Sequence, residues 1–383
     1  MLPHPPPGPP RRRFVALCGA AVLALGAGIA VGAGGGGGAT APRTPVAVKP
    51  PARAVAKAKE LSLERQVGEV LMIAFQGTTP PGYVQRALRQ GRATGVILFR
   101  ANAPSLTVTR SLTRRLQRAG RRRVLIAADQ EGGPIRILSW GAPRPSQGST
   151  PTELEARRQA SAAAKDLAAA GVNVALAPVA DVASTGSVMS GRAFPGGAAD
   201  VAKLTSAAVS GYRGTRIAPT LKHFPGLGQA GTNTDDAPVT ISAPRSALET
   251  RDLPPFEAGI KAGVPLVMAS HALFTALDRK HIASQSRPIL TTLLRRKLGF
   301  KGVVITDSME AAAVVKRSSI ELASLRAIAA GADIVLLTGP GSFPRVYRQL
   351  LTGARRSKKF RARIAEAAAR VIVLKRSLGL RAP

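Results

Sequence analysis

Residues 302–309 read GVVITDSM, a short run of apolar and β-branched residues that leads into the carboxylate of Asp307. Continuous Val and Ile runs of this length are typical of strands in a parallel sheet that helices cover on both faces. Working outward in both directions, seven more runs of this kind occur, at residues 69–75, 95–99, 124–129, 172–181, 218–224, 265–271 and 333–338. The pattern therefore predicts an α/β fold with eight parallel strands.

The segments between these runs carry helix boundary signals. Thr152 and Glu155 form a capping box at the start of one helix, which Gly171 ends, and a second helix runs from about Pro288 to Gly299. Eight strands alternating with helices in about 320 residues predict a TIM-type (β/α)8 barrel forming a single domain, residues 61–383. A doubly wound open sheet is the competing architecture.

The composition excludes several other classes of protein. The chain has 383 residues with 55 Lys and Arg against 21 Asp and Glu, a net charge of +34, yet 45% of it is hydrophobic. It is therefore neither a disordered basic tail nor a multi-span membrane protein. Scattered basic residues, few aromatic residues and no nucleic-acid-binding motif argue against a nucleic-acid partner. A single cysteine and four histidines without paired spacing argue against a disulfide or a metal site.

The first 60 residues read as targeting sequence. Three arginines at 11–13 precede an Ala, Val, Leu and Gly run that extends to about residue 33, as in a signal peptide or an N-terminal membrane anchor, residues 1–34. A Gly-, Pro- and Ala-rich linker is expected over residues 35–60. We therefore expect an exported protein of bacterial type, secreted or associated with the cell envelope, with no contact with the membrane other than this anchor.

Ionisable side chains follow five of the predicted strands. These are Asp129 after the third strand, Asp181 after the fourth, Lys222 and His223 in the fifth, His271 after the sixth and Asp307 after the seventh. Active sites of barrels of this type lie at the carboxyl ends of the strands, so the set predicts an active site. Any one of them, Asp181 for example, could instead cap the following helix.

Four motifs give the chain a family resemblance. They are KHFPGLG at 222–228, DQEGG at 129–133, GRAF at 191–194 and GVVITDSM at 302–309. Together, and in this order, they resemble the family 3 glycoside hydrolases, above all the single-domain β-N-acetylhexosaminidases that remove N-acetylglucosamine from cell-wall fragments. The resemblance implies a TIM barrel, a retaining mechanism, a carbohydrate substrate and no cofactor, and we expect a monomer.

The resemblance also implies roles for individual residues. Asp307 is the nucleophile that forms a covalent glycosyl-enzyme. Sugar hydroxyls are bound by a group of charged side chains: Asp129, Arg192, Lys222 and His223. His271 is either a further substrate contact or a buried, hydrogen-bonded histidine of the barrel. Glu131 is expected to be structural, accepting backbone N–H groups of the Gly132-Gly133 turn.

The chain departs from the family at the proton donor. The family has a histidine there, on a mobile loop, with an aspartate two residues earlier, and these positions hold Asp235 and Asn233. Leu227 and Pro134 stand where the family often has His and Arg. Asp235 or Asp236 supplies the acid if burial raises its pKa. Otherwise the protein is a weak or inactive sugar-binding barrel, or its chemistry differs, as in a β-glucosidase-type enzyme of the family.

Residues 226–231 read GLGQAG, which matches the G-x-G-x-x-G pattern of dinucleotide-binding proteins. The loop continues into an acidic, turn-rich segment that contains Asp235 and Asp236 and ends at Pro238, rather than into a helix. Such a segment repels phosphate, so a nucleotide site is not expected. We interpret these glycines as part of a lid that opens and closes over the sugar.

Overall fold

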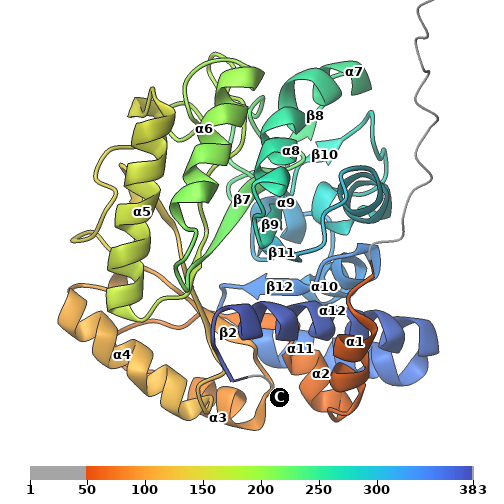
Figure 1. Ribbon diagram of the computed structural model, residues 1–383. Helices are drawn as coiled ribbons and strands as arrows, with labels where there is room; N and C mark the ends of the chain where they lie inside the picture. Colours follow the sequence, from red (N-terminus) through yellow and green to blue (C-terminus); the bar gives the residue numbers. More distant parts are fainter. Residues whose placement is uncertain (1–48, 382–383) are drawn as a thin grey trace, which may run out of the picture. The chain divides into compact units, whose positions relative to one another are not determined.

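The computed structural model describes residues 49–381. The predicted signal or anchor segment at 1–34 lies outside the described residues, as does the predicted linker up to residue 48. Within the described part, eight parallel strands form a closed barrel in the order β1-β12-β11-β9-β7-β6-β3-β2 (Figure 1). The barrel strands are β1 (Leu71–Ile73), β2 (Gly95–Leu98), β3 (Leu125–Ala128), β6 (Val174–Ala175), β7 (Ala218–Phe224), β9 (Leu266–Ala269), β11 (Val303–Ser308) and β12 (Ile334–Leu337). The prediction of a TIM-type barrel is confirmed, and the open-sheet alternative is wrong.

Helices connect and surround the strands (Figure 1). The α-helices are α1 (Ala52–Lys59), α2 (Leu63–Gly68), α3 (Gly82–Gln90), α4 (Leu106–Ala119), α5 (Glu153–Ala170), α6 (Ala198–Gly211), α7 (Arg245–Ala247), α8 (Leu253–Lys261), α9 (Ala312–Val315), α10 (Ile320–Ala330), α11 (Ser342–Arg356) and α12 (Lys358–Ser377). Two π-helical segments, η3 (Leu248–Asp252) and η5 (Pro288–Lys297), and three 3-10 turns, η1 (Arg100–Asn102), η2 (Gln147–Ser149) and η4 (Ala283–Gln285), complete the set. Among residues 49–381, no helix is both long and apolar enough to span a lipid bilayer.

Two short sheets lie outside the barrel. One is the antiparallel pair β4 (Gln130–Gly132) and β5 (Ile135–Arg136), and the other is the parallel pair β8 (Thr240–Ile241) and β10 (Leu273–Phe274).

The predicted helix boundaries at α5 are confirmed. The Thr152 hydroxyl accepts the Glu155 N–H at 3.2 Å, and Gly171 ends the helix with a φ of 77°. A positive φ suits glycine because it has no Cβ to clash. The second predicted helix is present as η5, and Gly299 follows it with a φ of 72°.

The fourth strand is shorter than predicted. Only Val174 and Ala175 pair on both sides, although the prediction covers residues 172–181. Pro178 follows, and proline lacks the N–H that a sheet ladder requires. The chain nevertheless stays extended, with a single bridge between Val179 and Lys222, and this brings Asp181 beside β7.

The interior of the barrel is filled by apolar side chains from alternate positions of the strands. Its members include Met72, Ile97, Leu125, Ala127, Val174, Ala218, Leu266, Met268, Val303, Ile305, Ile334 and Leu336. Val371, Leu374 and Leu378, in and just after α12, belong to the same buried cluster. Because α12 packs on the barrel in this way, it closes the end opposite to the carboxyl ends of the strands.

The ordered domain begins earlier than predicted, which corrects the linker boundary at residue 60. Residues 52–59 form α1, in which Ala54 and Ala58 lie one helical turn apart and are buried. They pack against Ala368, Ala369 and Ile372 of α12. A composition rich in alanine and lysine is compatible with a helix as well as with a linker, and the packing against α12 decides between them.

Candidate active site

An open cavity of about 410 Å³ lies at the carboxyl ends of the barrel strands. Its base is apolar and consists of side chains from the barrel interior, such as Ile97, Met268 and Leu336. Its walls carry most of the predicted site residues, namely Asp129, Arg192, Lys222, His223, Asp235 and Asp307. The structure thus brings together six side chains from distant parts of the chain.

Lys222 is the centre of a charged network. It lies in β7 and is 2% exposed, and its Nζ lies 2.5 Å from the Asp129 carboxylate and 2.7 Å from Glu131. Burial alone would lower the pKa of Lys222, but the charges of Asp129 and Glu131 outweigh it and raise this pKa. Lys222 therefore stays charged at the floor of the cavity and holds Asp129 in position.

Glu131 plays a different part from the one predicted. It does not accept the backbone N–H groups of the glycine turn; its two oxygens accept the Nε and Nη2 of Arg192 at 3.0 and 2.7 Å and its carboxylate also pairs with Lys222. Burial opposes its ionisation, but Lys222 and Arg192 lower the pKa of Glu131 to about 2. Glu131 thus fixes both cations. Asp129 and Glu131 are two residues apart, a spacing that places side chains on one face of extended backbone and that could have indicated this role.

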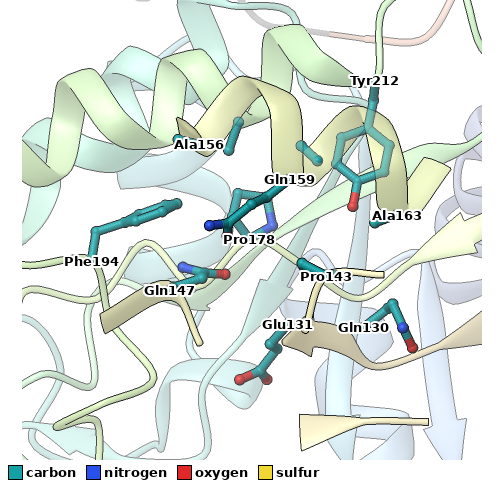
Figure 2. A pocket seen from close by; sticks show the side chains of 13 residues that line it. Gln130, Glu131, Pro143, Gln147, Ala156, Gln159, Ala163, Pro178, Phe194 and Tyr212 are labelled. Carbon is teal, nitrogen blue, oxygen red and sulfur yellow. The ribbon is translucent and has the colours of Figure 1, made fainter. Parts of the chain in front are cut away.

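Glu131 also lines a second, much smaller cavity, and Figure 2 shows Gln130, Gln147, Pro178 and Tyr212 around it. Its volume of about 20 Å³ is enough for a single water molecule and far too small for a sugar. Substrate chemistry therefore belongs to the open cavity.

His223 is held in one orientation by Asp181. Asp181 is fully buried and accepts the His223 Nδ1 at 2.8 Å, the His223 backbone N–H at 3.1 Å and the Leu227 N–H at 2.6 Å. With Nδ1 engaged in this way, Nε2 of His223 lies 4.0 Å from the carboxylate of Asp307. Asp181 is thus a positioning residue, and the alternative that it caps a helix is not what the structure shows.

Asp307 lies near the end of β11 and faces the cavity. Its Oδ1 accepts the N–H of Ser308 at 2.8 Å. Burial would raise the pKa of Asp307, but the charges of His223 and His271, the Ser308 N–H and Lys222 lower it overall. The carboxylate is therefore ionised over a wide range of pH, as a nucleophile must be.

Asp235 lies on the loop after β7 and lines the same cavity, with its side chain at the exposed rim. Partial burial, followed by the negative charge of Asp307, raises its pKa, although His223 acts in the opposite direction. The carbonyls of Thr234 and Asp235 accept the N–H groups of Ala313 and Ala312, at 3.0 Å each. These bonds fix the loop against the segment that follows β11.

The glycines of this loop serve close packing, which the sequence interpretation did not foresee. A Cβ on Gly228 would lie 1.9 Å from the carbonyl oxygen of Val182, and one on Gly226 would lie 2.7 Å from the Cβ of Asp252. Leu227 is buried between them. The first part of the loop is therefore anchored to its neighbours, and only the part around Asp235 remains at the surface.

His271, like Asp181 and Asp236, is a candidate site residue that does not line the cavity. It is fully buried, its Nδ1 lies 2.8 Å from the Ser284 hydroxyl and its Nε2 lies 2.9 Å from the Ser308 carbonyl. Both ring nitrogens are thus occupied by protein groups. This corrects the expectation of a substrate contact in favour of the alternative, a buried barrel histidine that supports the segment after Asp307.

The cavity also contains polar residues that the sequence analysis missed. Ser308, Glu310 and Thr338 line it beside Asp307. Glu310 Oε2 accepts the Thr338 N–H at 2.8 Å and hydroxyls of Thr338 and Ser308 at 3.2 and 3.3 Å. Thr338 directly follows the eighth strand, so a rule that considered hydroxyl as well as ionisable side chains at strand ends would have found it. Within residues 49–381, no cluster of His, Cys, Asp and Glu side chains has the arrangement of a metal site.

Comparisons with known proteins show which family this chain resembles. The profile described as glycosyl hydrolase family 3 N terminal domain matches residues 62–374. A protein of Arthroderma benhamiae, described as an uncharacterized secreted glycosyl hydrolase, is 33% identical over 75% of this chain and 85% of its own length. A beta-hexosaminidase of Xanthomonas oryzae pv. oryzae is 32% identical over 71% of this chain and 84% of its own.

Solved structures give the same result. The β-N-acetylhexosaminidase of Beutenbergia cavernae superposes with a TM-score of 0.75 and is 31% identical, over 82% of this chain and 98% of its own. A family 3 β-N-acetylglucosaminidase of Paenibacillus superposes with a TM-score of 0.79 at 30% identity over 83% of this chain, which spans only 63% of that longer protein. The chain therefore belongs to glycoside hydrolase family 3, in which it is a β-N-acetylhexosaminidase-like glycoside hydrolase.

Proposed function

We propose that this protein is a retaining β-N-acetylhexosaminidase that acts on cell-wall material containing N-acetylglucosamine. The observation that supports it best is that two carboxyl groups, those of Asp235 and Asp307, line one cavity at the carboxyl ends of the barrel strands. The pKa of Asp307 is lowered and that of Asp235 is raised. Such a pair suits a base or nucleophile and an acid acting on the same bond.

In this mechanism Asp307 attacks the anomeric carbon while Asp235 protonates the departing oxygen. The products of the first step are the free alcohol and a covalent glycosyl-enzyme on Asp307. Asp235, now ionised, then accepts a proton from water, which attacks the anomeric carbon and releases the sugar. Each step balances because the proton that Asp235 gives in the first step is recovered from water in the second.

The network around Lys222 supports binding of the sugar. We propose that Asp129, Lys222, Arg192 and His223 hydrogen-bond to hydroxyl groups of one pyranose. Asp129 and Lys222 are fixed by their own ion pair, so little side-chain freedom is lost when a sugar binds. Charge-assisted hydrogen bonds of this kind orient the ring for attack.

A non-hydrolytic sugar-binding barrel is the second candidate. It is favoured by the exposed position of Asp235 and by Asn233 and Asp235 at the positions where the family has its aspartate and histidine. Pre-steady-state kinetics with an activated aryl N-acetylglucosaminide separates the two. A burst of aryl alcohol and a sugar label on Asp307 identify the hydrolase, whereas saturable binding without release identifies the binding protein.

We also propose export to the cell envelope or beyond, directed by residues 1–34. The Arg triplet and apolar run support this proposal, as does the described secretion of the Arthroderma relative. Fractionation of cells that produce the full chain, compared with a chain lacking residues 1–34, tests it. Retention of both forms in the cytoplasm would contradict export.

A further inference from the structure

One segment of the barrel domain contains basic residues but no acidic ones. Residues 70–128 contain eleven arginines and no Asp, Glu or Lys. By contrast, the cavity described above is lined by four carboxylates, those of Asp129, Asp235, Asp307 and Glu310. This segment therefore differs from the cavity, in which the carboxylates outnumber the cations Arg192 and Lys222.

This segment borders two hollows that are lined in part by arginines. The first, of about 460 Å³, lies at α3 and α4 and includes Arg89, Arg115, Arg118 and Arg121. The second, of about 540 Å³, includes Arg122, Arg216 and Arg381. None of the residues that line either hollow is acidic. Arg115 donates only to neutral hydroxyls, those of Thr79 and Ser111. We call these seven arginines the basic surface.

The turn between the two hollows has an unusual backbone. Arg121 and Arg122 have φ angles of 54° and 63°, the only positive values among the non-glycine residues of 49–381. The turn follows the end of α4, where glycine is the favoured residue for this conformation. Placing other residues there costs on the order of 1 kcal/mol each. Arginine nevertheless occupies both positions, and the two side chains line different hollows.

The basic surface includes the end of the barrel opposite to the catalytic cavity. Residues 121–123 lead into the amino end of β3, and Arg216 lies just before the amino end of β7. Nearby, burial and the neighbouring cations Arg65, Arg121 and Arg381 lower the pKa of Arg123, although Glu69 partly opposes them. The arginines therefore repel one another, and a bound anion would relieve this repulsion.

We propose that the basic surface binds a flexible, phosphate-bearing polymer without bases, such as a polyol-phosphate or sugar-phosphate chain. Guanidinium groups match phosphate oxygens in a two-pronged geometry, and two adjoining hollows suit successive groups of one chain. No aromatic side chain lines either hollow, which disfavours nucleic acid. Tyr83 is the only exposed large apolar residue on α3 and α4, so an apolar anchor for a bilayer is largely missing.

Binding of fluorescently labelled linear polyphosphate, followed by anisotropy at several salt concentrations, tests the proposal. The test variant replaces Arg89, Arg115, Arg118 and Arg122 with glutamine. The matched control removes the same charge from exposed positions of α5 and α6, with Arg157, Arg158, Lys165 and Lys203 replaced by glutamine. Circular dichroism and thermal unfolding establish that both variants are folded. A second test variant, Arg118→Glu, reverses one charge of the basic surface, and its control, Arg158→Glu, reverses one exposed charge on α5.

We expect the test variant to bind polyphosphate at least about tenfold more weakly than the control at low salt. The slope of log Kd against log salt should also fall by about 0.7 for each phosphate group that the variant no longer neutralises. Equal weakening in both variants would overturn the proposal, since it would mean that total charge alone attracts the polymer. Displacement of polyphosphate by duplex DNA or by phosphatidylglycerol vesicles at a lower concentration of phosphate would also overturn it and identify the preferred partner instead.

Discussion

At the scale of single residues, the protein separates two chemically identical groups by their surroundings. Asp307 lies on a rigid strand, near the imidazole of His223, and receives the Ser308 N–H. Asp235 lies on a loop, near the negative charge of Asp307. The pKa values of the two carboxyl groups are displaced in opposite directions for these reasons, and the proposed mechanism depends on that difference.

The substitution Asp307→Asn should abolish turnover, by roughly 10⁴-fold or more, because the amide cannot form the glycosyl-enzyme. The fold and the ground-state affinity for N-acetylglucosamine should be nearly unchanged, since Asn has the same shape and still faces the cavity. Steady-state kinetics and calorimetric titration of the sugar measure the two effects. Undiminished hydrolysis would remove Asp307 from the mechanism.

The substitution Asp235→Asn should slow substrates with poor leaving groups by about 10² to 10⁴-fold, while those with good leaving groups are affected much less in the first step. Only a poor leaving group needs a proton to depart. Asp236→Asn is the matched control, because Asp236 is adjacent but does not line the cavity. An equal effect of Asp235→Asn on both classes of substrate would exclude an acid role.

The pH dependence of kcat/KM should be bell-shaped and displaced to acidic values. Activity requires Asp307 ionised, so it falls at low pH as that lowered pKa is reached, and it requires Asp235 protonated, so it falls again as pH rises through the raised pKa of Asp235. In the Asp235→Asn variant, kcat/KM should no longer fall as the pH rises. If that fall persists, a group other than Asp235 is responsible for it.

Individual site residues could be predicted from the sequence where a strand end fixes them. Asp129, Lys222, His223 and Asp307 all reach the cavity, as the strand-end rule implies. The spacing of Asp129 and Glu131 could have placed Glu131 beside Lys222, but its pairing with Arg192 joins segments 61 residues apart and could not be foreseen. The burial of His271 was one of two alternatives that the sequence left open, because the choice depends on Ser284 approaching from η4.

At the scale of elements, the loop after β7 is divided into an anchored part and an exposed part. Its first residues are fixed by Asp181, which accepts the Leu227 N–H, and by Ser184, whose N–H donates to the Gly228 carbonyl at 2.8 Å. Further along the loop, the carbonyls of Thr234 and Asp235 accept N–H groups of the segment after β11. The position of Asp235 therefore depends on contacts at both ends of the loop.

Gly228→Ala should displace this loop, because the new Cβ would meet the Val182 carbonyl oxygen at 1.9 Å. We expect a loss of about 1–3 kcal/mol in stability and a larger loss of kcat than of sugar affinity. Gly231→Ala is the control, since a Cβ there has open space around it and φ is not in the left-handed region. Normal kcat in Gly228→Ala would show that the anchored part does not position Asp235.

The eight barrel strands were predictable because most of them are continuous apolar runs, and all eight are present. Their lengths were less predictable. The fourth strand ends early at a proline that interrupts pairing, and α1 forms where composition suggested a linker because α12 supplies a surface on which it packs. The first difference has a local cause, the missing N–H of Pro178, and the second arises from contact with a distant segment.

At the scale of the whole molecule, stability should depend on pH through buried carboxyl groups with opposite shifts. Glu131 has a pKa of about 2, below its ordinary 4.5, so its contribution is present above pH 4.5 and is lost as the pH falls toward 2. Burial raises the pKa of Asp252 to about 6 from 3.8, although Arg251 opposes it, so its contribution is present at low pH and is lost as the pH rises through 6.

The free energy of unfolding should therefore be greatest at about pH 4 to 5. Denaturant titrations across this range measure it. Glu131→Gln should cost about 3–5 kcal/mol at neutral pH, because two buried cations lose a partner, and should flatten the acidic limb. Asp252→Asn should reduce the decrease in the free energy of unfolding between pH 4 and 6. If the pH dependence of the free energy of unfolding is unchanged in both variants, other groups govern it.

The closure of the far end of the barrel by α12 limits how a substrate can reach Asp307. With Val371, Leu374 and Leu378 filling the far end, a polymer has no route through the middle of the molecule. A sugar must therefore enter and leave through the cavity at the carboxyl ends of the strands, and the rest of the substrate must remain on that side of the barrel. The leaving group and the attacking water must use that same entrance.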